Sequence, residues 1–251
     1  RGLGDVYKRQ PVGLMGGEPY RIMELTPYVG ASKATSSVIL YVMMHIFSHF
    51  CFWFFSIFLY LALRPVDIAM GTILAVVGAV SLLAIYFFMK GYKNGMAVRT
   101  LKLLQHIPFV KEWAKRFSEN KREALERVDS QIAELHKQRR STFYASLSLE
   151  FMARIIGCLE VYFILNILTT DVSFPACILI MAFTSLFANL FFFSPMQLGA
   201  REGGFALAVG GLAIPGAFGV YTGLITRVRE LIWIVIGVLL MKVGNGTPAN
   251  K

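Results

Sequence analysis

Charged residues are scarce in this chain. Asp, Glu, Lys and Arg make up 16% of its 251 residues, whereas 56% are hydrophobic. A soluble globular domain has about 25% charged residues, so this composition excludes an ordinary soluble protein and predicts that lipid covers much of the surface. The formal net charge is +10, but the cations cluster between apolar runs and do not line one polar face. This arrangement is typical of the positive charges that set the topology of a membrane protein, and we therefore expect no nucleic-acid partner.

The chain also lacks the sequence signatures of reactive centres. Its three cysteines, Cys51, Cys158 and Cys177, fall within apolar runs without a CxxC spacing, which predicts small buried hydrophobic residues. No nucleophile elbow, P-loop, dinucleotide fingerprint, DxD-like pair or triad-like arrangement occurs. These absences argue against a self-contained enzyme, although enzymatic activity stays an open alternative.

Histidine is equally rare. His45 and His49 are spaced i, i+4 and share one helix face, as metal ligands can. The other two, His106 and His136, lie in a polar stretch, and no carboxylate occurs in the apolar segment of the first pair. We therefore expect His45 and His49 to form hydrogen bonds between helices, and we expect neither a metal nor a cofactor.

Long apolar runs are abundant. A bilayer core of about 30 Å requires about 20 predominantly apolar residues in a helix. Four segments meet this requirement, at about residues 38–63, 68–89, 147–168 and 174–193. Two others are ambiguous, because glycines and Pro215 interrupt residues 205–223, and residues 231–241 are too short to cross alone. The predicted fold is an all-α, polytopic membrane helix bundle of about six segments, two of them short, broken or re-entrant.

The ends of the apolar runs predict domain limits and orientation. Residues 1–10, RGLGDVYKRQ, lack an initiating methionine and resemble an assembly scar, so we exclude them and expect residues 11–251 to be a single transmembrane domain within a fragment. Residues 90–140 contain 13 Lys and Arg against 6 Asp and Glu, which places the loop 90–143 in the cytoplasm. Its apolar periodicity predicts a helical hairpin, which either caps the bundle or binds anionic headgroups.

Ionisable residues within the apolar runs are candidates for function. A charge in the bilayer centre costs roughly 3 kcal/mol on insertion scales, so we expect each such residue to have a structural or functional role. Glu150 and Arg154 are four residues apart with the carboxylate on the N-terminal side, the orientation that favours pairing. They are predicted to form either a structural ion pair or part of a polar pathway for lipid.

A polar segment, PMQLGAREGG at residues 195–204, follows one apolar run and leads into a glycine-rich one. Irregular backbone at membrane depth requires protein or a water-filled cavity to satisfy its polar groups. If Glu202 begins a half-helix, the free N–H groups there would suit a phosphate. A tightly packed helix hairpin is the structural alternative.

Arginines supply the other candidate contacts. A charged segment precedes the short final run and contains Arg227, Arg229 and Glu230. Near the start of the chain, Glu18 and Arg21 are three residues apart. Because the planar guanidinium binds phosphate through two hydrogen bonds, Arg227 is a candidate phosphate ligand, with a membrane-end anchor as the alternative.

Three of these elements have a characteristic order and spacing. They match a GE..R motif, a P-x-x-L-G-x-R-E motif and an arginine about 25 residues later, at Gly17, Glu18 and Arg21, then Pro195, Leu198, Gly199, Arg201 and Glu202, then Arg227. In this order they resemble the lysylphosphatidylglycerol synthase/flippase transmembrane-region family, which includes proteins formerly labelled dolichol-phosphate glucose synthetase-like. The resemblance covers nearly everything after residue 10, although Met196 and Gln197 stand where the family usually has paired glycines.

The resemblance implies a function in lipid movement. In the best-understood relatives this domain moves a modified phospholipid between leaflets, a separate soluble domain makes that lipid, and about two helices precede the GE..R motif. It therefore predicts a multi-pass protein of a cell membrane, the bacterial inner membrane, that translocates an anionic, aminoacylated or polyprenyl-phosphate lipid. A membrane-protein or lipid-modifying enzyme is a possible partner. The alternatives are an integral membrane enzyme or accessory subunit of lipid glycosylation or aminoacylation, and a purely structural partner of another membrane protein.

The predicted substrate site gathers separated polar elements in one cavity reached from the cytoplasmic leaflet. The arginines would contact phosphate and the glutamates a cationic or hydroxylated headgroup. One shared polar cavity would satisfy all these groups at once. The predicted substrate-binding residues are Glu18, Arg21, Arg201, Glu202 and Arg227, with Glu150 and Arg154 as further candidates.

Overall fold

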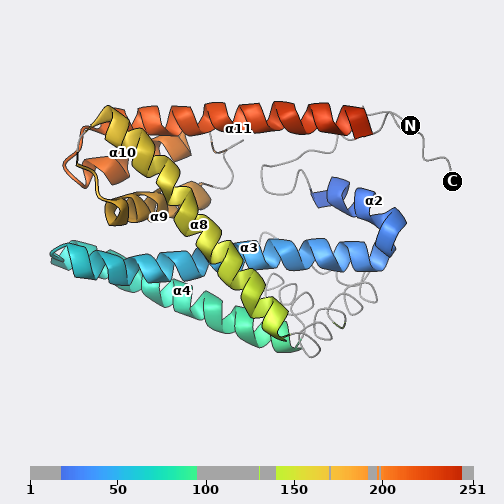
Figure 1. Cartoon of the computed structure of the whole chain (residues 1–251). Helices are drawn as coiled ribbons and strands as arrows, with labels where there is room; N and C mark the ends of the chain where they lie inside the picture. The colour runs from blue at the N-terminus through green and yellow to red at the C-terminus, as the bar shows by residue number, and fades with distance from the viewer. Residues whose placement is uncertain are drawn as a thin grey trace. The chain divides into compact units, whose positions relative to one another are not determined.

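The computed structural model describes residues 18–94, 130, 140–169, 171–191, 197 and 199–244 (Figure 1). Within these residues the protein is all-α, with no strand, which confirms the predicted fold class. The helices are α2 (Glu18–Val29), α3 (Ala31–Leu63), α4 (Ile68–Asn94), α8 (Arg140–Leu168), α9 (Phe174–Leu190), α10 (Ala200–Gly210) and α11 (Gly216–Gly244). The predicted scar, Gly17 and nearly all of the predicted cytoplasmic hairpin lie outside the described residues.

Three of the helices are long and apolar enough to cross a membrane. These spans are Ala31–Leu63, Ile68–Lys90 and Ser141–Leu168, and α9 is a shorter apolar helix of 17 residues. All four predicted apolar segments are therefore helical. Two helices begin about seven residues earlier than predicted, because α3 and α8 continue through polar residues that an apolar-run count leaves out. The chain is a multi-pass membrane helix bundle.

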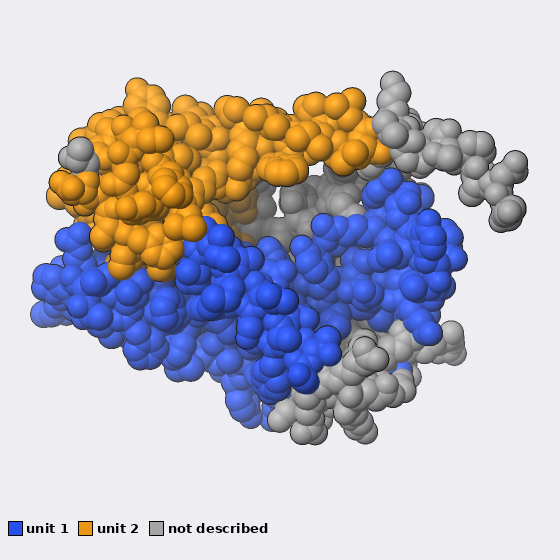
Figure 2. Space-filling model, viewed as in Figure 1, with its two compact units in different colours: residues 1–156 blue, residues 157–251 orange. Residues whose placement is uncertain are grey.

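The chain divides into two compact units, Arg1–Ile156 and Gly157–Lys251 (Figure 2). The division falls within α8, which contributes its first half to unit 1 and its second half to unit 2. Each unit is described separately below. The single transmembrane domain expected over residues 11–251 stays a prediction.

In unit 1, α3 packs along both α2 and α4 (Figure 1). Aromatic residues dominate the buried core of this unit, where the rings of Phe47 and Phe88 stack with centroids 4.1 Å apart and Phe143 of α8 joins them. Gly30 separates α2 from α3 at a φ of +82°, a conformation that glycine adopts without strain. At the other end of α3, the Asp67 side chain accepts a hydrogen bond of 2.8 Å from the Met70 amide and caps α4.

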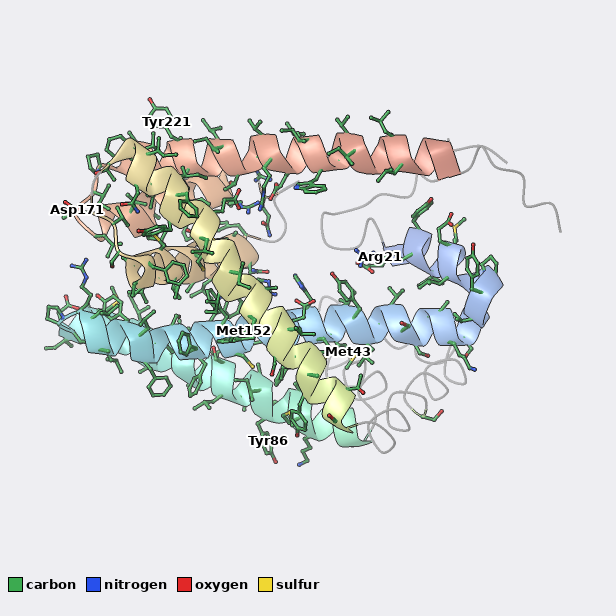
Figure 3. The ribbon with its side chains drawn as sticks, viewed as in Figure 1. Arg21, Met43, Tyr86, Met152, Asp171 and Tyr221 are labelled. Atoms are coloured by element: carbon green, nitrogen blue, oxygen red, sulfur yellow. The ribbon has the colours of Figure 1, made fainter. Side chains whose placement is uncertain are left out.

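Unit 2 consists of the second half of α8 with α9, α10 and α11. Its core includes the fully buried side chains of Val161, Leu165 and Phe205. Asn166 holds the turn between α8 and α9, because its side chain donates to the Val172 carbonyl at 3.0 Å and accepts from the Val172 amide at 3.2 Å. The turn includes a left-handed residue, Asp171, with φ of +70° (Figure 3).

The predicted burial of the cysteines is confirmed for two of the three. Cys158 of α8 and Cys177 of α9 form no disulfide and are fully buried in unit 2. Cys51 of α3 is free and partly buried against the core of unit 1. All three behave as small apolar residues in helix packing.

Glycines allow very close packing between the helices of unit 2. A Cβ atom added at Gly219 of α11 would lie 2.5 Å from the carbonyl oxygen of Phe205 in α10. At Gly223 it would lie 3.2 Å from the Cα of Glu202, and at Gly204 it would lie 3.3 Å from the Cα of Thr184 in α9. The glycine-rich segment therefore forms the tightly packed helix hairpin that the sequence offered as its structural alternative.

The last two apolar segments differ from their predicted limits. Helix α10 ends at Gly210, a turn with Ala213 at φ +61° follows, and α11 then runs unbroken for 29 residues. The separate short helix expected at residues 231–241 is the second half of α11. The helix continues through Arg227, Arg229 and Glu230 because each of these side chains is paired with a charge of opposite sign.

Candidate functional site

Arg154 of α8 forms the centre of a polar cluster in unit 1. Its Nε donates to Ser48 Oγ at 2.7 Å, its Nη1 lies 3.1 Å from His49 Nδ1, and its Nη2 donates to the His45 carbonyl at 2.9 Å. A guanidinium can only donate, so His49 Nδ1 must accept, and this fixes the proton of a neutral His49 on Nε2. The predicted hydrogen bonding of the two histidines between helices is thereby confirmed.

Glu150 joins the same cluster one turn before Arg154. Its Oε2 lies 3.4 Å from His45 Nδ1, and that nitrogen is also 3.4 Å from Arg154 Nη2. The sequence predicted that Glu150 and Arg154 form either an ion pair or part of a polar lipid pathway, and in the structure both side chains contact His45 Nδ1. It did not include Ser48 or the two histidines among the site residues. The i, i+3 and i, i+4 spacing of His45, Ser48 and His49 is the signal for a shared polar face.

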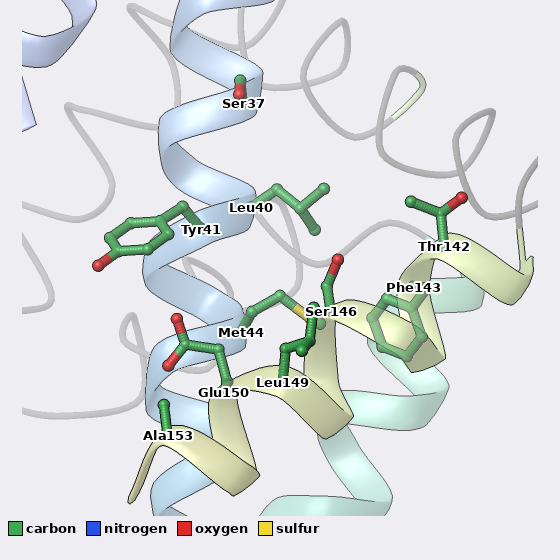
Figure 4. Close-up of a pocket in the computed structure, with 10 residues that line it drawn as sticks. All are labelled: Ser37, Leu40, Tyr41, Met44, Thr142, Phe143, Ser146, Leu149, Glu150 and Ala153. Carbon is green, nitrogen blue, oxygen red and sulfur yellow. The ribbon is translucent and has the colours of Figure 1, made fainter. Parts of the chain in front are cut away.

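A pocket of about 540 Å³ lies beside this cluster, between the first half of α3 and the start of α8 (Figure 4). Glu150 and Tyr41 contribute polar atoms to its wall, and Leu40, Met44 and Phe143 contribute apolar surface. Arg154 does not line it. Glu150 therefore faces a cavity on one side and the α3 histidine on the other.

We expect Arg154→Gln to destabilise the protein by roughly 2–3 kcal/mol, because it removes one member of a charged, hydrogen-bonded cluster between helices. Glu150→Gln should cost less, and the double variant should cost clearly less than the sum. Thermal unfolding of purified protein in detergent measures all three. The neutral control is Lys90→Gln, which changes an exposed cation whose Nζ lies 3.3 Å from the Tyr86 hydroxyl. Additive losses would contradict a structural pairing and favour the lipid-pathway interpretation.

Glu18 and Arg21 pair with each other on α2. Their side chains approach to 3.7 Å, and the Arg21 guanidinium also lies 4.8 Å from the centre of the Tyr41 ring on α3 (Figure 3). The Arg21 side chain is half exposed. The cation–π contact attaches α2 to α3 within unit 1.

Unit 2 contains a second polar cluster, which Arg227 of α11 organises. Its Nε donates to Glu202 Oε1 at 2.9 Å, its Nη2 donates to the Gln197 carbonyl at 3.0 Å, and its Nη1 lies 3.5 Å from Glu230 Oε2. Only 16% of the Arg227 side chain is exposed. All three nitrogens of this guanidinium are therefore engaged in the structure.

Arg201 completes the cluster from α10. Its Nη1 pairs with Glu230 Oε1, so the Glu230 carboxylate holds Arg201 with one oxygen and Arg227 with the other. Two arginines and two glutamates thus form a chain with balanced charge, and we call Arg201, Glu202, Arg227 and Glu230 the charge network. Balanced pairing is what allows four ionised side chains to lie among apolar helices.

Local structure positions the acidic side of the charge network. Glu202 lies in the first turn of α10, where its Oε2 accepts a hydrogen bond of 2.9 Å from the Gly199 amide. Gly199 has a φ of +79°, which glycine tolerates. The Arg227 Nε donates to the other Glu202 oxygen, Oε1, so both oxygens of this carboxylate accept hydrogen bonds. Glu202 is therefore a fixed carboxylate.

Arg229 lies outside the charge network. It pairs with Glu160 of α8 through Nη1 and Oε2 at 2.7 Å, and 48% of its side chain is exposed. The two neighbouring arginines of α11 therefore have different surroundings. This agrees with their two-residue separation, which turns about 200° around the helix axis at about 100° per residue.

The structure brings together part of the predicted substrate site. Arg201, Glu202 and Arg227 form one cluster, whereas Glu18 and Arg21 belong to a separate unit. Convergence of these two groups on one cavity stays a prediction. The sequence noted Glu230 without assigning it to the site, and its three-residue spacing from Arg227 was the available signal. Among the residues that the structure describes, no three His, Cys, Asp or Glu side chains gather as a metal site requires.

Comparison with known proteins identifies the family. The family model described as the lysylphosphatidylglycerol synthase TM region matches residues 10–237. No curated protein and no solved structure gave a match. The matched region includes every residue of the charge network and of the Arg154 cluster. The chain thus belongs to the lysylphosphatidylglycerol synthase TM region family, whose members are membrane proteins of lipid modification or flipping.

Proposed function

We propose that this protein moves a phospholipid between the leaflets of a cell membrane, without covalent chemistry. The observation that carries the proposal is the charge network, in which two arginines from different helices are held together by one carboxylate. Such a pair of planar donors matches the oxygens of a headgroup phosphate. The family supports work on a lipid, and it leaves flipping and modification as alternatives.

The charge network offers a lipid headgroup polar contacts within apolar surroundings. A phosphate that reaches the arginines would exchange one anion for another, so the positive charges would never be left without a partner. Exchange of partners costs much less than desolvation of a free ion, for which insertion scales give roughly 3 kcal/mol per charged group and simulations more. A bacterial inner membrane location and a lipid-modifying enzyme as partner are parts of the same proposal.

Reconstitution in liposomes tests this function. Purified protein is placed in vesicles of phosphatidylcholine and phosphatidylglycerol that carry a fluorescently labelled phosphatidylglycerol in both leaflets. An impermeant quencher then reports how much label becomes accessible from outside. We expect label from the inner leaflet to be quenched much faster than in protein-free vesicles, and equal rates would refute the proposal. Formation of a glycosylated or aminoacylated lipid from an added activated donor would favour the enzymatic alternative.

A further inference from the structure

The Glu230 carboxylate occupies an unusual position in unit 2. Its two oxygens contact two different arginines, Arg201 of α10 and Arg227 of its own helix. It thereby presents one negative charge, shared by two oxygens, between two guanidinium groups. The phosphate of a phosphodiester presents the same features, with one negative charge shared by its two non-bridging oxygens, and arginine pairs readily with both kinds of anion.

The charge balance of the site agrees with a ligand of this kind. Arg201 and Arg227 contribute two positive charges, and the fixed Glu202 carboxylate balances one of them. One positive charge is left for the group between the arginines. A phosphodiester supplies one negative charge, whereas a phosphate monoester carries about 1.5 to 2 at neutral pH. The site is therefore better matched to a diester.

The two glutamates differ in how firmly they are held. Glu202 is 14% exposed and accepts hydrogen bonds from both Arg227 and the Gly199 amide. Glu230 is 34% exposed, and its two oxygens contact Arg201 and Arg227. Glu230 is thus the more accessible acid of the network and the one that an incoming anion can displace.

We propose that Glu230 is a built-in occupant of a phosphodiester-binding site made by Arg201 and Arg227. The carboxylate holds the arginines in position when the site is empty, and a diester headgroup takes its place. This inference rests on the proposed function in taking the diester to be a lipid headgroup. It adds the class of phosphate and the residue that competes with it.

The test is direct binding of short-chain lipids to the full chain in detergent, measured by isothermal titration calorimetry. The probes are dihexanoyl phosphatidylglycerol, a diester, and dihexanoyl phosphatidic acid, a monoester. Removing the internal competitor should strengthen diester binding, so we expect Glu230→Gln to bind phosphatidylglycerol about tenfold more tightly than the wild type. The monoester should bind more weakly than the diester in both proteins.

Two further variants make the result specific. Glu160→Gln removes a carboxylate whose ion pair is with Arg229 and which acts on Arg201 only as a nearby charge, so it should strengthen diester binding much less than Glu230→Gln does. Glu230→Asp retains the charge on a shorter side chain that reaches both arginines less well, and it should give an intermediate affinity. If Glu230→Gln fails to fold, Glu230→Asp tests the inference by itself. It should then bind the diester more tightly than the wild type does.

The outcomes separate this inference from the proposed function. Unchanged or weaker diester binding in both Glu230 variants would overturn the inference, even if the wild type exchanges lipid between leaflets. Equal tightening in Glu160→Gln would overturn it too, because general loss of negative charge would then explain the effect. Tighter binding in the Glu230 variants without leaflet exchange would uphold the inference and refute transport.

Discussion

Gly219→Ala should destabilise the protein by about 3 kcal/mol or prevent its folding. The new Cβ would lie 2.5 Å from the Phe205 carbonyl oxygen and 2.7 Å from the Cα of Ala206. Both contacts are with backbone atoms, so no side chain can rotate to relieve the overlap, and α10 and α11 would have to move apart. Overpacking of this kind typically costs about 1–3 kcal/mol, and backbone contacts place this site at the upper limit. Thermal unfolding in detergent and membrane abundance measure the effect.

Gly237→Ala is the matched control, because Gly237 lies in the same helix and has no neighbouring atom within 4 Å of the added Cβ. Alanine favours helix by about 1 kcal/mol over glycine, so this variant should be as stable as the wild type or slightly more stable. A similar loss for both variants would mean that helix propensity or insertion, and not the close approach of α10 and α11, explains the sensitivity of Gly219.

The second large effect is expected at Arg227. Arg227→Lys keeps the charge, but a single ammonium cannot replace the three nitrogens that reach Glu202, Glu230 and the Gln197 carbonyl. If the same arginine binds a headgroup phosphate, loss of the planar fork should reduce leaflet exchange about tenfold or more, since a tenfold change corresponds to about 1.4 kcal/mol. The rate is measured in liposomes at equal protein content.

Arg229→Lys provides the comparison for Arg227. Arg229 makes one ion pair, with Glu160, and about half of its side chain is exposed, so lysine can retain most of that interaction. Exchange should fall less than twofold. Equal activity of the two variants at equal membrane abundance would show that the proposed phosphate role of Arg227 is wrong. Unfolding temperatures should be measured for both, because Arg227 also stabilises the charge network.

The helical segments were predictable because run length and hydrophobicity act locally. Residues 38–63, 68–89 and 147–168 are helical, as are residues 174–190 of the fourth predicted run, and the differences from prediction lie at helix ends. The continuity of α11 could not be predicted in the same way. Arg227, Arg229 and Glu230 indicate a break when they are considered alone, whereas their partners come from α8 and α10, tens of residues earlier.

The candidate site, too, could be predicted only in part. Motif spacing selected Arg201, Glu202 and Arg227, and the structure places them in one cluster. Motif spacing could not show that Glu230 joins the two arginines, because that contact depends on how closely α10 and α11 approach at Gly219 and Gly223. The glycines themselves fitted either a cavity or a tight hairpin, since glycine permits irregular backbone and close packing alike.

The unbroken length of α11 bears on how fast a lipid could cross. Its 29 residues measure about 43 Å, and Arg227 lies about 17 Å along the axis from the first residue, Gly216, with a similar apolar length beyond Glu230. If the proposed function is right, α11 lies across a hydrocarbon layer of about 30 Å and carries its charges near the middle of the bilayer. A crossing headgroup has its highest free energy at that depth. A binding site at that depth would replace one high barrier with two lower ones, and the slower of the two steps would set the rate of lipid transport.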